Sequence, residues 1–96
     1  MLTLQRGQIV FSKAGRDKGK IMVVLASENE FLTLADGKHR TLQNPKKKKL
    51  KHVQPTKTII QMQPACGRAL QDADIRKALK LYESSNVKDF LNLEGG

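Results

Sequence analysis

The 96-residue sequence predicts a mainly β fold, in which a small five-stranded barrel precedes a C-terminal amphipathic helix and a short helical turn. Apolar runs in strand-like alternation flank a glycine-bounded loop, and further short apolar runs separated by turn signals follow them. The apolar period then changes to that of a helix. A chain of this length is expected to form one domain with a modest core. We expect 1–63 to form the barrel, and 64–96 to form a linker and a helical appendage of the same domain.

The first three strands are predicted from apolar and β-branched residues. In 8–12, Ile9 and Phe11 alternate with Gln8, Val10 and Ser12, and 21–25 is continuously apolar. A polar connection at 27–30 leads to a short apolar strand at 31–34. The chain therefore begins with two strands around a loop and continues into a third.

Two further strands are predicted from turn signals. Asp36-Gly37 is a strong two-residue turn signal, so we expect 38–42 to pair back across it as the fourth strand. Asn44-Pro45 then interrupts regular structure, and the lysines of 46–49 are expected to cross the surface and to be presented there. The last strand is predicted from 52–53 together with 56–62.

The helix is predicted over 74–84, because four apolar residues recur there at helical spacing. These residues are Ile75, Ala78, Leu79 and Tyr82. Asp72 or Asp74 can accept the unpaired N–H groups at the helix start. A short helical turn is expected at 87–91, and 93–96 is expected to fray. The role of the helix stays open, and closing an open end of the barrel is one possibility.

The net charge of +9 is concentrated in the first part of the chain. Residues 1–58 hold thirteen Lys and Arg against four Asp and Glu, whereas 59–96 hold five of each. This asymmetry is typical of a polyanion-binding module joined to a neutral appendage. The four consecutive lysines at 46–49 repel one another, and a phosphate backbone is the obvious partner for them.

The remaining composition narrows the classes of function. Cys66 is the single cysteine, so no intramolecular disulfide is expected, and the chain suits a reducing compartment. No apolar stretch is long enough to span a membrane or resembles a signal peptide, so a soluble cytoplasmic protein is expected. The four aromatic residues make base stacking a weak option, and Phe11 and Phe31 are expected in the core.

Segment 7–24 resembles the KOW motif of ribosomal and transcription-factor proteins, an RNA-contacting strand-loop-strand unit within a small SH3-like barrel. Its most specific part is Ala14-Gly15-Arg16-Asp17-Lys18-Gly19-Lys20 between two apolar strands. Transcription-factor members usually carry a further glycine shortly afterwards, where this chain has Ile21-Met22-Val23, so the likeness is closer to the large-subunit ribosomal members. With the basic run that follows, the chain resembles small bacterial KOW-domain RNA-binding proteins related to KOW-bearing large-subunit ribosomal proteins.

This resemblance implies a ribosome-associated RNA-binding protein of translation, with structured RNA and ribosomal proteins as partners in a ribonucleoprotein. Because lysine is a flexible point charge, we expect it to contact phosphates rather than to read bases. The residues expected to contact RNA are Lys13, Gly15, Arg16, Lys18, Gly19, Lys20, Lys38, Arg40, Lys46, Lys47, Lys48, Lys49 and Lys51. The two glycines would allow close approach of the backbone.

Other classes of function find less support in the residues. The acids form no evident catalytic pair, and no phosphate-loop motif is present, so we expect no enzyme, no cofactor and no small-molecule substrate. His39 and His52 have no acid at ligand-like spacing, so no metal site is expected. A protein-interaction adaptor is the main alternative, because SH3-like barrels host many functions. Charge alone also leaves DNA open as the nucleic acid.

Overall fold

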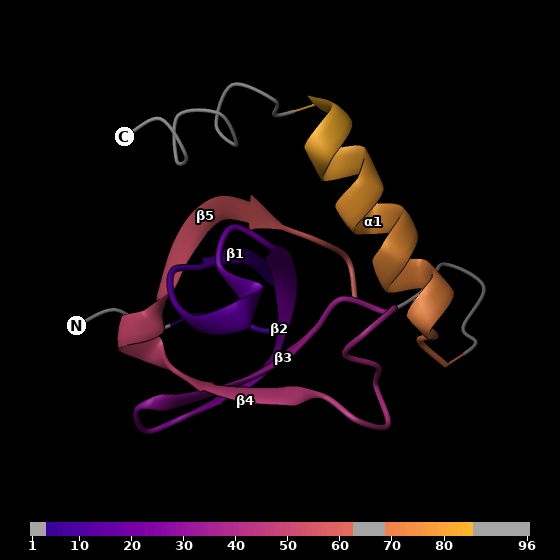
Figure 1. The fold of residues 1–96 in the computed structure, drawn as a ribbon. Helices are drawn as coiled ribbons and strands as arrows, with labels where there is room; N and C mark the ends of the chain where they lie inside the picture. Colours follow the sequence, from indigo (N-terminus) through magenta and orange to yellow (C-terminus); the bar gives the residue numbers. More distant parts are fainter. Residues whose placement is uncertain (1–3, 63–68, 86–96) are drawn as a thin grey trace.

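Residues 4–62 and 69–85 of the computed structural model are described here. Five strands form one antiparallel sheet in the order β4-β3-β2-β1-β5, and one α-helix follows them (Figure 1). The elements are β1 (Gln8–Ser12), β2 (Ile21–Glu28), β3 (Phe31–Ala35), β4 (Lys46–Lys49), β5 (Val53–Ile59) and α1 (Asp72–Ser85), with 3-10 turns η1 (Gly15–Asp17) and η2 (Leu50–His52). The prediction of a mainly β fold with a helix near its C-terminal end is confirmed.

Strands β1 and β2 are interior strands of the sheet and are covered on both faces. Ile9 of β1 and Val23 of β2 belong to one hydrophobic cluster, whereas their neighbours Val10 and Met22 belong to a second one. This division follows from the strand period, which sends successive side chains to opposite faces. All four side chains are at most 1% exposed. The continuous apolar run predicted for 21–25 therefore reflects burial on two sides.

The first hydrophobic cluster lies between the sheet and α1. Ile75, Leu79 and Tyr82 of the helix pack there with alternate residues of β1 and β2. The rings of Phe11 and Tyr82 meet edge to face, with centroids 6.3 Å apart. The predicted apolar stripe is confirmed for these three residues, whereas Ala78 is half-buried outside the cluster, and the helix packs against a face of the sheet.

The second hydrophobic cluster lies on the other face, where the sheet curls (Figure 1). It contains Leu32 and Leu34 of β3 and Val53 of β5, in addition to residues of β1 and β2. Residues of β3 and of the edge strand β5, which are separated by β2 and β1 in the strand order, thus share one apolar interior, which requires the sheet to bend around it.

The predicted fourth strand at 38–42 is wrong. Oδ1 of Asp36 accepts hydrogen bonds from the backbone N–H groups of Lys38, His39 and Arg40 at 2.8, 2.9 and 2.8 Å, so this segment forms a loop. An aspartate side chain competes with strand pairing in this way because it offers nearby amides a closer acceptor. The fourth strand is instead the lysine run of β4, which pairs with β3.

Hydrogen bonds from helix α1 also hold the loop at 36–42 in place. The guanidinium of Arg76 donates to the carbonyl oxygen of Gly37 at 2.5 Å, and the N–H of Leu42 donates to Oδ1 of Asp72 at 2.8 Å. The carboxylate of Asp74 accepts from the N–H of Gln71, one residue before the helix, at 2.9 Å. Asp74 thus supports the helix start as expected, whereas Asp72 holds the loop.

The last strand begins one residue later and ends three residues earlier than predicted, and it includes 54–55, because β5 spans Val53–Ile59. Its pairing with β1 shifts register between Gln8 and Val10. At this shift Oγ1 of Thr56 donates to the carbonyl oxygen of Ile9 at 2.7 Å. Pro55 fits here because β5 is an edge strand, where a missing backbone donor is tolerated. Cys66 and the turn and frayed end predicted at 87–91 and 93–96 lie outside the described residues.

Candidate nucleic-acid interface

The basic loop, residues 13–20, joins β1 to β2. Its base is closed by backbone hydrogen bonds from the N–H of Ser12 to the oxygen of Lys20 at 3.0 Å and from the N–H of Gly19 to the oxygen of Ser12 at 2.8 Å. Oγ of Ser12, which is 2% exposed, donates to the oxygen of Ala14 at 3.1 Å. Four cationic residues in this loop are exposed, namely Lys13, Arg16, Lys18 and Lys20. Gly15 is also exposed and Gly19 is half-buried.

The lysines of β4 alternate between two environments. Lys47 and Lys49 are exposed, and their Nζ atoms lie 5.1 and 5.9 Å from the centroid of the Phe31 ring. These distances are typical of cation–π contact. Lys46 is half-buried, and Lys48 is only 8% exposed. The prediction that the whole run is presented at the surface is wrong for Lys48, because β4 pairs Lys48 with buried Leu32.

The basic loop and the lysine run contact each other directly. Nζ of Lys48 donates to the carbonyl oxygen of Ala14 at 2.8 Å. The backbone N–H of Lys13 donates to the oxygen of His52, in η2 directly after β4, at 2.8 Å. Two segments more than thirty residues apart in the sequence are thereby joined, and exposed Lys51 lies in η2 beside this junction.

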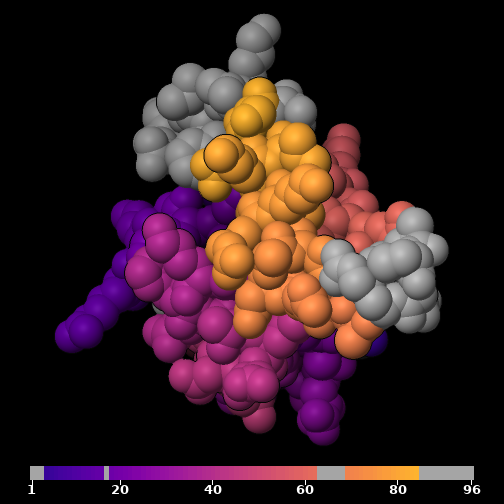
Figure 2. All heavy atoms as spheres, turned by 90° about the vertical axis from the view of Figure 1, so that its right-hand side faces the viewer, coloured from indigo at the N-terminus to yellow at the C-terminus, as the bar shows by residue number. Residues whose placement is uncertain are grey.

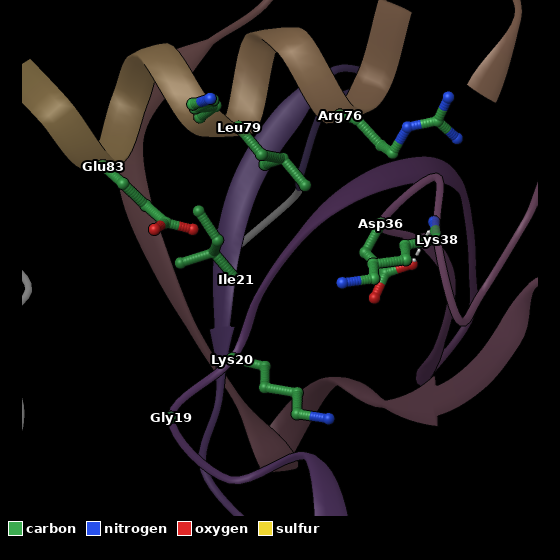
Figure 3. Close-up of a pocket in the computed structure, with 9 residues that line it drawn as sticks. Gly19, Lys20, Ile21, Asp36, Lys38, Arg76, Leu79 and Glu83 are labelled. Carbon is green, nitrogen blue, oxygen red and sulfur yellow. Dashed lines mark hydrogen bonds between the residues drawn. The ribbon is translucent and has the colours of Figure 1, made fainter. Parts of the chain in front are cut away.

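Lys38 and Arg40 belong to the loop at 36–42. Lys38 is exposed and Arg40 is half-buried. Lys38 lines a groove with Lys20 of the basic loop and with Arg76 and Lys80 of α1 (Figure 3). The space-filling view facing α1 shows the helix lying against the magenta part of the chain around residue 40 (Figure 2). The structure thus brings Lys38 close to one end of the basic loop.

Arg76 and Lys80 are not among the residues that the sequence predicts as RNA contacts. Their spacing of four residues puts them on one helix face, one turn apart. That spacing was a usable signal, but it does not say that the basic loop lies opposite this face. Only the packing of α1 on β1 and β2 brings the two together.

In 4–62 and 69–85, no three His, Cys, Asp or Glu side chains gather closely enough to hold a metal ion. Helix α1 is 14 residues long, and no helix in the described part of the chain has the length and apolarity that crossing a membrane requires.

The comparison with protein-family models finds no match, and neither does the comparison with curated proteins.

Proposed function

We propose that this protein binds structured RNA through its phosphate backbone, with the basic loop and the exposed lysines of β4 as its main contacts. The observation that carries the proposal is the junction between the two basic segments, where Lys48 contacts Ala14 and Lys13 contacts His52. This junction holds the two basic segments next to each other, and each phosphate that their exposed cations neutralise releases condensed counterions.

The finer description of the fold belongs to the same proposal. We propose that the curled sheet is a small SH3-like barrel of the KOW type, and that the RNA is ribosomal or similarly folded. The basic loop lies between β1 and β2, where the resemblance expects a strand-loop-strand unit to carry it. Folded RNA offers closely spaced phosphates and 2′-hydroxyl groups, which such a loop can contact without entering the deep major groove.

The lysine run 46–49 also has structural roles, so only some of its lysines support RNA binding. Strand β4 is at an edge of the sheet, and lysines at an edge discourage pairing with another chain. Lys48 holds the basic loop through Ala14. Lys47 and Lys49 therefore carry the β4 part of the proposal, and the exposed cations of the basic loop carry the rest.

Neutralising either group of cations should weaken RNA binding. The test variants are Arg16→Gln/Lys18→Gln and Lys47→Gln/Lys49→Gln, and the control is Lys57→Gln/Lys77→Gln, which removes two exposed charges from β5 and α1. Affinity is measured by fluorescence anisotropy with a labelled RNA stem-loop over a series of salt concentrations. Each test variant should bind about tenfold more weakly at low salt, with a salt slope flatter by about 0.7 to 0.9 per lost phosphate contact.

The same assay separates the alternatives. Test variants that bind as tightly as the control would contradict the assigned surface. Equal competition by duplex DNA and by unlabelled stem-loop RNA would make the protein a general polyanion binder. No binding of RNA or DNA by the unmodified protein would favour the protein-interaction adaptor instead.

A further inference from the structure

A groove lies between the basic loop and helix α1. It has a volume of about 440 Å³, which is within the range of about 300 to 1,000 Å³ that is usual for small-molecule sites. We name it the loop–helix groove. It is lined by Gly19, Lys20, Ile21, Asp36, Lys38, Arg76, Leu79, Lys80 and Glu83.

The cations of the loop–helix groove come from three separate parts of the chain. Lys20 belongs to the basic loop, Lys38 to the loop at 36–42, and Arg76 and Lys80 to α1. They face two carboxylates, so the groove is cationic on balance. One of the carboxylates, Asp36, is already held by three backbone N–H groups.

The charges are divided along the groove. Figure 3 shows Lys20, Lys38 and Arg76 on one side of Leu79 and Ile21, with Glu83 on the other side. Lys80 lies between Arg76 and Glu83 along α1, about one turn from each. Phosphate groups are attracted to the cationic end. Beyond a short apolar section, Glu83 offers a carboxylate that can accept a hydrogen bond from a hydroxyl or amino group. This order of chemistry matches a phosphate, followed by a sugar and a base.

The walls of the groove are formed in advance. Arg76 donates to Gly37 at 2.5 Å, and Asp72 accepts from Leu42 at 2.8 Å, so α1 and the loop at 36–42 are joined at two points. Arg76 uses one of its five N–H donors in this contact and keeps others for a ligand. A preformed site avoids much of the entropy cost of ordering side chains on binding.

We propose that the loop–helix groove binds one nucleotide of the RNA strand, with its phosphate at the cationic end and its sugar and base directed toward Glu83. This inference rests on the proposed function. Lys20 belongs both to the basic loop and to the groove, so a strand that contacts the basic loop can continue into the groove. Helix α1 is then part of the RNA-binding surface.

The test uses two lysines of α1 that differ only in whether they line the groove. Lys80 lines it and Lys77 does not, although both are exposed and lie on the same helix. Lys80→Gln should weaken binding of the labelled stem-loop RNA by about 3- to 10-fold and flatten the salt slope by about 0.7 to 0.9, whereas Lys77→Gln should stay within about twofold of the unmodified protein. Lys38→Gln, on a different element, should behave like Lys80→Gln.

A second measurement identifies the ligand chemistry and separates a strand from a free nucleotide. Amide NMR spectra are recorded during titration with uridine monophosphate and with uridine. The phosphorylated compound should shift the amides of Gly19, Lys20, Leu79 and Lys80, uridine should not, and Lys80→Gln should abolish the shifts. Binding of uridine monophosphate without any effect of Lys80→Gln on RNA affinity would overturn the strand proposal and assign the groove to a free nucleotide.

The two proposals fail in different ways. If the basic-loop variants lose RNA affinity while Lys80→Gln and Lys38→Gln behave like Lys77→Gln, the groove proposal is wrong and the proposed function stands. If the unmodified protein does not bind RNA at all, both proposals are wrong.

Discussion

Single residues show how identical side chains acquire different tasks. Lys47, Lys48 and Lys49 are consecutive, yet Lys48 is 8% exposed and bonded to Ala14, whereas its two neighbours are exposed over Phe31. The strand period is the whole cause, because alternate positions face opposite sides of the sheet. A change at Lys48 thus alters the support of the basic loop, whereas a change at Lys47 or Lys49 alters the exposed charge.

Two glycines with the same backbone conformation provide a prediction at this scale. Gly15 and Gly37 have φ of +78° and +79°, a region that other residues enter only with strain. A Cβ at Gly37 would collide with the backbone oxygen of Asp72 and lie 2.9 Å from Cγ of Arg76, whereas at Gly15 the nearest atom is Nζ of Lys48 at 3.9 Å. Gly15→Ala should cost about 1 kcal/mol from backbone strain.

Gly37→Ala should cost about 3 kcal/mol, because the collision with α1 adds to the same strain. Chemical denaturation of both variants measures the difference. Since the backbone strain is matched, Gly15→Ala is the control for it. Equal losses of stability would show that α1 does not pack closely against Gly37.

Among the elements, β4 is the least expected one. Four lysines have low strand propensity, so the sequence indicated a surface connection. Pairing with β3 overrides this preference: it places Lys48 opposite Leu32 and brings Lys47 and Lys49 over the Phe31 ring. An edge strand made of lysines also resists pairing with a second copy of the chain.

Making this edge apolar should cause self-association. Lys47→Val/Lys49→Val keeps a strand-forming sequence and removes both exposed charges, so copies of the chain should pair edge to edge. Light scattering at increasing protein concentration measures the effect. Lys47→Gln/Lys49→Gln loses the same charges but stays polar and should remain largely monomeric. If the valine variant also stays monomeric, the edge charges do not serve this purpose.

The elements that sequence predicted correctly are those whose pattern is decided by burial. Alternation around the basic loop located β1 and the start of β2, and the helical stripe of Ile75, Leu79 and Tyr82 located α1. The prediction failed at 38–42, where the Asp36 side chain takes three amides from a possible strand. Such a contact depends on local geometry that residue types do not determine.

The candidate site likewise contains residues that the sequence could predict and residues whose roles depend on tertiary packing. The charged residues of the basic loop could be identified from composition and glycine spacing, because they lie within one short segment. The burial of Lys48 depends on strand register, and the role suggested for Arg76 and Lys80 depends on how α1 docks. Both are long-range consequences of packing, so a linear pattern could not give them.

At the scale of the whole molecule, helix α1 from the charge-neutral C-terminal part is integrated with the basic part. Helix α1 contributes Ile75 and Leu79 to the core and Arg76 and Lys80 to the loop–helix groove. The sequence separated a basic module from an appendage, whereas the structure makes them share one hydrophobic cluster and one groove. Stability and the proposed RNA binding therefore depend on the same helix.

This integration predicts that one helix residue stabilises the entire fold. Ile75 is 0% exposed between α1 and the sheet, so Ile75→Ala should lower the free energy of unfolding by about 2 to 5 kcal/mol. Leu81→Ala is the matched control, since Leu81 is 61% exposed on the same helix and should cost no more than about 0.5 kcal/mol. The circular dichroism of the helix and the NMR amide signals of β1 and β2 should give one coincident transition, and an earlier loss of the helix signal would contradict a shared core.

The position of β1 and β2 has a mechanical consequence. The two strands that hold the basic loop are interior strands of the sheet and are buried on both faces, so their amides should be among the last to open in hydrogen exchange. A force applied to the basic loop by a bound ligand would then be resisted by β1 and β2, which are among the strands that open most slowly. The edge strands β4 and β5 can open locally without displacing the two strands that hold the basic loop.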